Sequence, residues 1–252
     1  GDPADALRQA REELGLERRA DLKVEHVGEV IDQGPLPLAD LRDRSAGTLS
    51  AGQGRRLGLA RLAVIGREVL LLGAGPGVGR HRPALEAYIR RARPLVIALN
   101  TQSAIAPDLI DLRAACHPMR LMADCEAHLA LPQPLVTPAA MLPDDLRAAL
   151  AGKELLDFGI RLEEGRFAFG ETHCATPSLL VLAYALAVAA AGRAGRILVA
   201  GFDGYPEGDG RNAEVEEIFR LMEAHPDGPP VISITPTRYK HLEQLSLYGL
   251  RS

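Results

Sequence analysis

The sequence predicts a doubly wound, mostly parallel, Rossmann-like α/β sheet with helices on both faces. Apolar runs such as Glu68–Gly75 and Arg196–Asp203 are nearly continuous, which is typical of strands that are covered on both faces. Amphipathic or Ala-rich segments separate these runs, so strands and helices alternate along the chain. That alternation favours parallel strands, with ligands bound outside their carboxyl ends.

The individual elements follow from the same periodicity, with Gly and Pro at their boundaries. The Ala-rich helix that ends at Gly192 has a slim surface that can pack closely on a sheet. The expected helices are Arg55–Ile65, Arg82–Arg91, Ala106–Cys116, Asp144–Leu150, Leu179–Gly192 and Ala213–Ala224. The expected strands are Glu68–Gly75, Pro94–Asn100, Met119–Asp124, Arg196–Asp203 and Val231–Pro236.

The first quarter of the chain differs in composition from the rest. Asp5–Leu16 predicts a helix, Asp21–Ile31 a short strand and turn, and 32–54 is rich in Gly, Pro and Ser, as linkers and docking arms are. We therefore expect an N-terminal arm or small helical segment over 1–66 and an α/β domain over 67–252. Gly1 before Asp2 suggests a tag remnant, and we expect the chain to be a fragment of a longer protein.

Composition excludes several classes of function. The net charge of −4 and the pI near 6.0 argue against a nucleic-acid binder, which normally carries a basic excess. The longest apolar stretch, Leu179–Ala191, is too short to span a membrane. Cys116, Cys125 and Cys174 have no C-x-x-C spacing, which favours a reducing compartment. We expect a cytoplasmic protein that is a candidate homo-oligomer.

A glycine-rich turn connects the first strand of the expected domain to the next helix. Such a turn offers free backbone N–H groups to an anion, so Gly73, Gly75, Pro76 and Gly77 are candidate phosphate-binding residues. An NAD site is disfavoured because the next strand ends in Asn100, where a carboxylate would hold the ribose. The alternative is a tight turn that binds nothing.

The segment Leu49–Gly73 resembles the signature helix of ABC ATPases followed by the strand that carries the Walker B acid. Two features argue against that function. The motif G-x-x-x-x-G-K-[ST] does not precede the segment, and Gly73 stands where an aspartate would hold Mg²⁺.

A small polar loop precedes the Ala-rich helix. Thr172, His173 and Thr176 are expected near the helix start, where hydroxyl and N–H groups can hold a phosphate or a sugar. His173 is the candidate general acid or base, with a simple loop histidine as the alternative. Asp203, at a strand end, could bind ribose or a cation, or cap the next turn.

No metal site is expected from the spacing of the titratable residues. The grouped side chains match no zinc template and are interpreted as the edge of a cleft; they are His117, Asp124, Cys125, Glu126 and His128. A serine-hydrolase nucleophile elbow, G-x-S-x-G, is also absent from the sequence.

Four segments occur in an order and spacing that resemble a known arrangement: "VLLLGAGPGV", "VIALN", "THCATPSLLVLAYALAVAAAGRAGRILVAGFDGY" and "SITPTRYKHLEQLSLYGL". Over roughly Arg67–Gly249 the chain resembles the sialyltransferase-like α/β domain of CMP-sialic acid transferases, motility-associated factors and pterin-diphosphokinase-like proteins. The closest likeness is the version C-terminal to 4-hydroxy-2-oxovalerate aldolase-like proteins of bacterial surface-polysaccharide loci.

This resemblance implies a site and a function. It implies Gly73, Gly75, Pro76 and Gly77 at a phosphate-side turn, Asn100 near the base or ribose, and Thr172 and Thr176 in the nucleotide pocket, although Gly77 replaces the usual serine. The implied ligand is CMP or another nucleotide, or a CMP-keto-sugar, and a catalytic form would be a glycosyltransferase. Two alternatives stay open: a non-catalytic docking domain for an upstream aldolase, or a pterin diphosphokinase that requires Mg²⁺.

Overall fold

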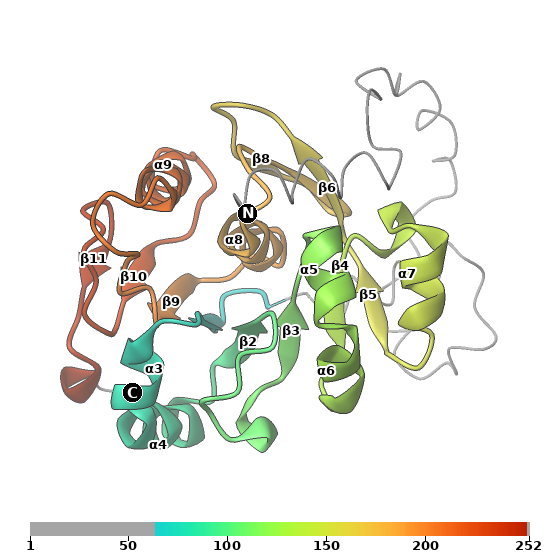
Figure 1. Cartoon of the computed structure of the whole chain (residues 1–252). Coiled ribbons are helices and arrows are strands. Elements are labelled where there is room, and N and C mark those ends of the chain that lie inside the picture. Colours follow the sequence, from blue (N-terminus) through green and yellow to red (C-terminus); the bar gives the residue numbers. More distant parts are fainter. Residues whose placement is uncertain (1–63, 251–252) are drawn as a thin grey trace. The chain divides into compact units, whose positions relative to one another are not determined.

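The computed structural model describes residues 64–250, and within them eight strands form one parallel sheet (Figure 1). The strands are β1 (Glu68–Leu72), β2 (Leu95–Leu99), β3 (Leu112–Ala114), β4 (Leu135–Thr137), β5 (Leu155–Asp157), β9 (Arg196–Ala200), β10 (Val231–Ser233) and β11 (Glu243–Gln244). Their order is β11-β10-β9-β1-β2-β3-β4-β5, and every neighbouring pair is parallel. The predicted doubly wound α/β sheet is confirmed.

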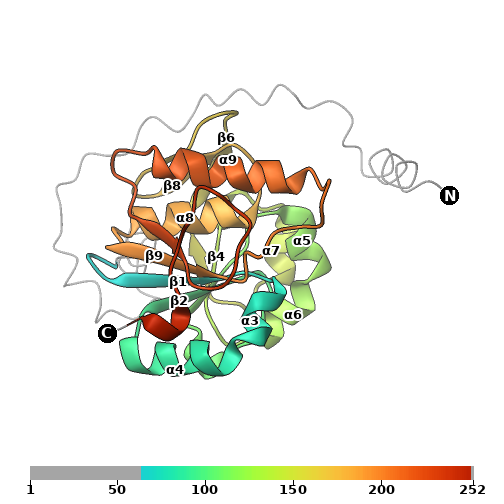
Figure 2. The same cartoon turned by 90° about the vertical axis from the view of Figure 1, so that its left-hand side faces the viewer.

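Helices cover both faces of this sheet. Figure 2 shows α8 and α9 on one side of β1, β2 and β9, and α4 on the other. The α-helices are α3 (Pro76–Arg80), α4 (Arg82–Ala92), α5 (Pro118–Ala123), α6 (Cys125–Ala130), α7 (Asp144–Ala149), α8 (Val181–Ala191) and α9 (Arg211–Glu223). Three 3₁₀ turns are η3 (Pro107–Leu109), η4 (Ala139–Met141) and η5 (Leu247–Gly249).

The central strand β1 shows why the apolar runs are continuous. Leu71 belongs to the core beneath α8, whereas Leu70 and Leu72 belong to the core beneath α4. Successive side chains of a strand point to opposite faces, so a strand covered on both faces needs apolar residues at every position.

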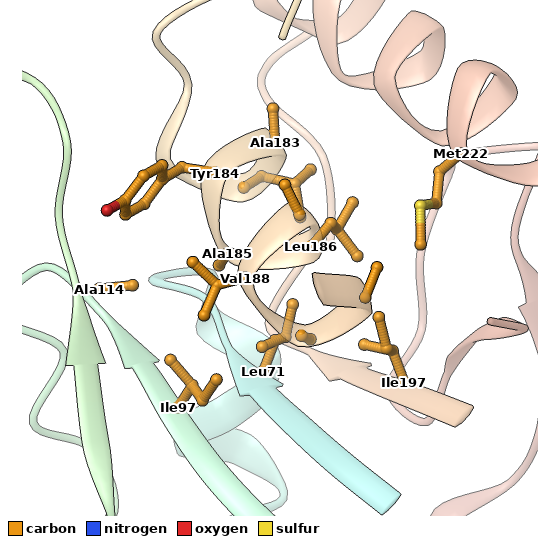
Figure 3. Packing of buried hydrophobic residues seen from close by; sticks show 14 of the residues in the cluster. Leu71, Ile97, Ala114, Ala183, Tyr184, Ala185, Leu186, Val188, Ile197 and Met222 are labelled. Atoms are coloured by element: carbon orange, nitrogen blue, oxygen red, sulfur yellow. The ribbon is translucent and has the colours of Figure 1, made fainter. Parts of the chain in front are cut away.

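The Ala-rich helix α8 is buried around most of its circumference. Figure 3 shows its small side chains against Leu71, Ile97 and Ile197 of the sheet. Alanine permits close contact between helix and sheet, because no long side chain separates the backbones. The buried Tyr184 hydroxyl donates a hydrogen bond to the Phe158 carbonyl oxygen at 2.6 Å, so its polar atom is satisfied.

A second, three-stranded sheet precedes α8. It consists of β6 (Gly159–Leu162), β8 (His173–Thr176) and β7 (Ala168–Phe169), in the order β6-β8-β7. β8 pairs parallel with β6 and antiparallel with β7. The segment that was expected to be a polar loop at the helix start is therefore partly a strand.

Two predicted elements are wrong. The expected helix Ala106–Cys116 is the short 3₁₀ turn η3 followed by β3, and the expected strand Met119–Asp124 is the helix α5. Pro118 occupies the first turn of α5, and Arg120 forms an ion pair with Asp124 one turn later. Both features favour a helix over a strand.

The chain leaves β1 on one side toward β2–β5 and returns on its other side as β9, then continues to β10 and β11. The strand order thus reverses between β1 and β9, and ligands of such sheets bind in the crevice at that point. Among residues 64–250, no helix has the length and apolar character needed to cross a membrane. The elements predicted before Val64 lie outside the described residues, and the domain boundary predicted at 66/67 stays a prediction.

Candidate functional site

The glycine turn after β1 lies against the end of β9. The Gly73 and Gly75 N–H groups donate to the carbonyl oxygens of Ala200 and Gly201 at 2.8 and 2.9 Å. A Cβ added at Gly75 would lie 2.5 Å from the Gly201 carbonyl oxygen and 2.3 Å from Asp203 Oδ2. Glycine is required there because the two strand ends approach too closely for any side chain.

Asp203 fills the space at the turn that a phosphate was expected to occupy. Its Oδ2 accepts a hydrogen bond from the Gly77 N–H at 3.1 Å, and both carboxylate oxygens lie 2.9 Å from the position of a Gly77 Cβ. α3, which begins at Pro76, is also only five residues long. An anion at Gly77 would have to displace this carboxylate or meet its negative charge.

The loop after β2 forms the facing wall of the site. Asn100 has a left-handed backbone with φ of 51°. The Gln102 amide is tied down, since Nε2 donates to the Gly73 carbonyl oxygen and Oε1 accepts from the Ala104 N–H at 2.6 Å. In the described part of the chain, by contrast, no hydrogen bond engages the side chains of Asn100, Thr101 or Ser103.

A buried guanidinium supports this loop from beneath. Arg113 of β3 is 0% exposed and donates from Nη1 to the Asn100 and Gln102 carbonyl oxygens at 3.1 and 2.7 Å. Its Nε donates to Gln133 Oε1 at 2.8 Å, and Nη2 has no partner within the described residues. Burial lowers the pKa of Arg113 to about 10, so the group stays charged at neutral pH.

A cleft of about 530 Å³ lies between these walls, at the carboxyl ends of β1, β2 and β9. This volume lies within the usual range for small-molecule sites. Arg120 and Asp203 are the charged residues that line it. The remaining lining residues are Gly73, Ala74, Gly75, Pro76, Leu99, Asn100, Thr101, Gln102, Ser103, Leu180, Val181, Leu182, Gly201, Phe202, Gly204, Tyr205, Pro206, Val215 and Tyr239.

The start of α8 and Arg120 of α5 also line the cleft. Leu180 is the N-cap of α8 and provides no side-chain cap. The N–H groups of Val181 and Leu182 have no hydrogen-bond partner among residues 64–250. Arg120 is exposed, and its Nε donates to Asp124 at 2.6 Å, which leaves the other guanidinium nitrogens available to a ligand.

Two tyrosines, Tyr205 and Tyr239, line a further part of the cleft. Arg211 stacks on the Tyr205 ring, 4.1 Å from its centroid, and Arg238 donates to the Tyr205 carbonyl oxygen at 2.7 Å. Asn212 Oδ1 accepts from the Tyr205 N–H at 2.9 Å and also contacts the Tyr239 hydroxyl at 3.3 Å. These contacts hold the loop after β9 in place.

The structure brings some of the predicted site residues together and separates others. Gly73, Gly75, Pro76, Asn100 and Asp203 line the cleft, and Gly77 touches it through its bond to Asp203. Sequence reasoning missed Arg120 and Arg113. The predicted site residues that do not line the cleft are Thr172, His173 and Thr176.

These three residues lie on or beside β8. His173 is exposed, with Nδ1 3.3 Å from the Thr172 hydroxyl, and Thr176 is buried and donates to the Ser178 carbonyl oxygen at 2.9 Å. They are separated from the cleft because the chain forms a strand there before α8 begins at Val181. Asp124, expected at a strand end, lies instead between α5 and α6 and pairs with Arg120.

The described residues contain no group of three or more His, Cys, Asp and Glu side chains that could hold a metal ion. The site therefore has the form of a small-molecule cleft at the reversal point of a doubly wound sheet. One wall is occupied by a carboxylate, and the other offers neutral hydrogen-bonding groups.

Sequence comparisons point to ATP-binding proteins. The chain is 59% identical over 51 residues to the cytochrome c biogenesis ATP-binding export protein CcmA of Roseobacter denitrificans, covering 20% of this chain and 24% of that protein. It is 52% identical over 56 residues to the CcmA protein of Ruegeria pomeroyi, covering 22% and 27%. The chain thus spans about a quarter of the length of these curated relatives, and no family model matches it.

These findings correct the sialyltransferase-like resemblance, which is wrong. The curated likeness is to ATP-binding export proteins, and it does not support a glycosyltransferase, a CMP-keto-sugar ligand, a role in surface polysaccharides, a pterin kinase or an aldolase partner. That resemblance depended on the order and spacing of four segments, and a glycine turn after a buried strand is common to many doubly wound sheets of unrelated function. The curated relatives agree in class with the other resemblance in the sequence, that of Leu49–Gly73 to the signature helix of ABC ATPases. That resemblance was set aside because the Walker motifs are missing.

Proposed function

We propose that the α/β unit binds ATP or a related purine nucleotide in the cleft between β1, β2 and β9. The observation that carries the proposal is the convergence of unengaged hydrogen-bonding groups on one concave site at the point where the strand order reverses. The likeness to ATP-binding export proteins supports a nucleotide as the ligand.

The charges of the cleft favour one orientation of that nucleotide. Phosphate oxygens are expected beside Arg120 and the N–H groups of Val181 and Leu182, because these are the cationic and donor groups of the site. Phosphates are not expected at Gly77, whose N–H already binds the Asp203 carboxylate. Asn100, Thr101 and Ser103 lie on the wall opposite the turn and can donate or accept along the ligand.

We expect binding without rapid hydrolysis. The sequence contains no G-x-x-x-x-G-K-[ST] motif, whose lysine reaches the β- and γ-phosphates in P-loop enzymes. Asp203 is the one carboxylate among the residues that line the cleft, and its Oδ2 is held by Gly77. A single, internally bonded carboxylate is a poor Mg²⁺ site.

The test is equilibrium binding of ATP to the full 252-residue chain, with and without Mg²⁺, while phosphate release is measured in parallel. CMP, the nucleotide that the sequence resemblance implied, and NAD⁺ serve as comparison ligands. We expect saturable ATP binding that exceeds the binding of CMP and does not require Mg²⁺.

An Arg120→Met variant should weaken ATP binding about tenfold, because a charge-assisted contact to phosphate is lost. The matched control is Arg82→Met, since Arg82 is equally part of an i,i+4 ion pair, with Glu86, but does not line the cleft. Absence of saturable ATP binding, or equal loss in both variants, would contradict the proposal.

A further inference from the structure

The Asp203 carboxylate retains most of its capacity to accept hydrogen bonds. A carboxylate has about four lone-pair positions on two oxygens. Within residues 64–250, its recorded hydrogen bond is the one that Oδ2 accepts from Gly77 at 3.1 Å. The residue is half-buried and lines the cleft, and Oδ1 and the remaining lone pair of Oδ2 have no partner among the described residues, so they can accept hydrogen bonds from a ligand.

The backbone on both sides of Asp203 is fixed. The Thr237 hydroxyl donates to the Phe202 carbonyl oxygen at 2.6 Å. Gly204 has φ of 104°, and a Cβ there would lie 2.3 Å from Arg238 Cδ. The carboxylate itself is held by its hydrogen bond from the N–H of Gly77, a residue 126 positions away in the sequence. The acceptor is therefore held in place before a ligand arrives, which lowers the entropic cost of binding.

We propose that Asp203 makes the glycine-turn wall a receptor for the vicinal hydroxyls of the ribose, so that the cleft selects ribonucleotides over nucleotides that lack these hydroxyls. A fixed, negatively charged acceptor favours groups that donate hydrogen bonds and disfavours phosphate. In an adenine nucleotide such as ATP, the neighbouring neutral groups that can donate a pair of hydrogen bonds to one carboxylate are the 2′- and 3′-hydroxyls.

The positive charge of Arg120, the other charged residue that lines the cleft, agrees with this assignment. Arg120 and the start of α8 supply the donors for phosphate, and Asp203 supplies the acceptor for the sugar, so opposite groups of the ligand meet opposite groups of the protein. The turn that was predicted to hold a phosphate would hold the sugar instead. This inference rests on the proposed nucleotide binding and specifies which part of the nucleotide the turn receives.

The test compares the dissociation constants of ATP and 2′,3′-dideoxy-ATP for the full-length chain. Wild type should bind the dideoxy nucleotide at least about tenfold more weakly, because hydrogen bonds to a charged group are among the stronger ones. Asp203→Asn preserves an acceptor for the Gly77 N–H but removes the charge, and it should narrow the difference to within about twofold. Thermal unfolding of each variant reports whether the fold is intact.

Asp209→Asn is the matched control. Asp209 lies in the same connection between β9 and α9 and pairs with Arg211, but it does not line the cleft, so this variant should keep the wild-type preference. Equal affinity of wild type for ATP and its dideoxy analogue would overturn the inference while leaving nucleotide binding intact. An unchanged preference in a folded Asp203→Asn protein would also overturn it. Failure of both nucleotides to bind wild type would instead contradict the proposed function.

Discussion

The two walls of the cleft differ in how their hydrogen-bonding groups are used. On the glycine-turn wall, the N–H groups of Gly73, Gly75 and Gly77 all bond to other parts of the protein. On the wall formed by 100–103, three of the four side chains are unengaged in the described structure, and the backbone is supported by the buried Arg113.

This difference shows that the motif most easily recognised in the sequence is not the one with the most free hydrogen-bonding groups. The glycine turn is the more recognisable motif, yet its N–H groups join β1 to the end of β9. The inconspicuous polar loop presents free groups to the cleft. Substitutions of the glycines on the first wall should therefore affect folding, and substitutions of side chains on the second wall should affect binding.

The largest expected effect is that of Gly75→Ala. A Cβ at this position would lie 2.5 Å from a backbone oxygen that cannot move independently of β9, so the two strand ends must separate. We expect a loss of about 3 kcal/mol or more in the free energy of unfolding, measured by urea denaturation.

The control for this prediction is Gly79→Ala, because nothing lies within 4 Å of a Cβ added at Gly79. The control should be neutral or slightly stabilising. Similar stability of the two variants would contradict the close contact described for the first wall.

A pH series tests the interior near the second wall. His128 of α6 is 0% exposed, and neither ring nitrogen has a partner in the described part. Burial lowers its pKa to about 4, with the positive charges of Lys153, Arg113 and Arg120 acting in the same direction and Asp124 opposing them.

Because the unfolded state binds the His128 proton more tightly, this contribution to stability is present above about pH 6.5 and is lost as the pH falls toward 4. We expect a loss on the order of 2–3 kcal/mol from this group over that interval. His128→Leu should flatten the dependence of unfolding free energy on pH between 6.5 and 4. If the unfolding free energy of His128→Leu depends on pH as steeply as that of wild type, the assignment of a buried, neutral His128 imidazole is contradicted.

Arg113→Met is expected to affect both stability and binding. The substitution leaves the Asn100 and Gln102 carbonyl oxygens without their buried donor, which should cost about 2 kcal/mol in unfolding free energy and weaken nucleotide binding several-fold. Arg91→Met is the control, because Arg91 also donates to a carbonyl oxygen, that of Leu250, but at an exposed position. Unchanged nucleotide affinity in a folded Arg113→Met protein would show that the loop does not depend on this support.

The smallest change in stability is expected for the double variant Thr101→Val and Ser103→Ala. Neither hydroxyl forms a hydrogen bond within the described residues, so the unfolding free energy should change by less than about 0.5 kcal/mol. Nucleotide affinity should fall several-fold, as measured by calorimetry.

His173→Ala provides the comparison, since this residue was predicted as catalytic but lies on the exposed end of β8. It should leave affinity unchanged. A larger loss of nucleotide affinity in His173→Ala than in the double variant would contradict the assignment of the binding side chains to the loop after β2.

The sequence predicted the fold where a single physical rule decides the element. Continuous apolar runs predicted β1, β2 and β9 to within three residues at each end, and helical periodicity predicted α4 and α9 to within two. β3 was misassigned because its central residue is Arg113, and a charged residue normally indicates an exposed position. Its burial depends on Gln133 and on the loop after β2, which are brought near it only by the fold.

The position of the cleft was predicted from the sequence, but its details were not. The rule for parallel sheets located the cleft at the ends of β1, β2 and β9. The bond between Asp203 and Gly77 joins residues 126 positions apart, and no local pattern encodes it. The order in which β8 precedes α8 likewise removed His173 from the cleft, although it is close to the helix in sequence.

The most direct test of the central claim is a map of backbone amide shifts in the full-length, deuterated chain during titration with ATP. Saturable shifts are expected at the amides of Asn100–Ser103 and at Val181 and Leu182, with much smaller changes at Thr172 and His173. Binding that shifts other amides and leaves these positions unchanged would contradict the assignment of the cleft as the nucleotide site.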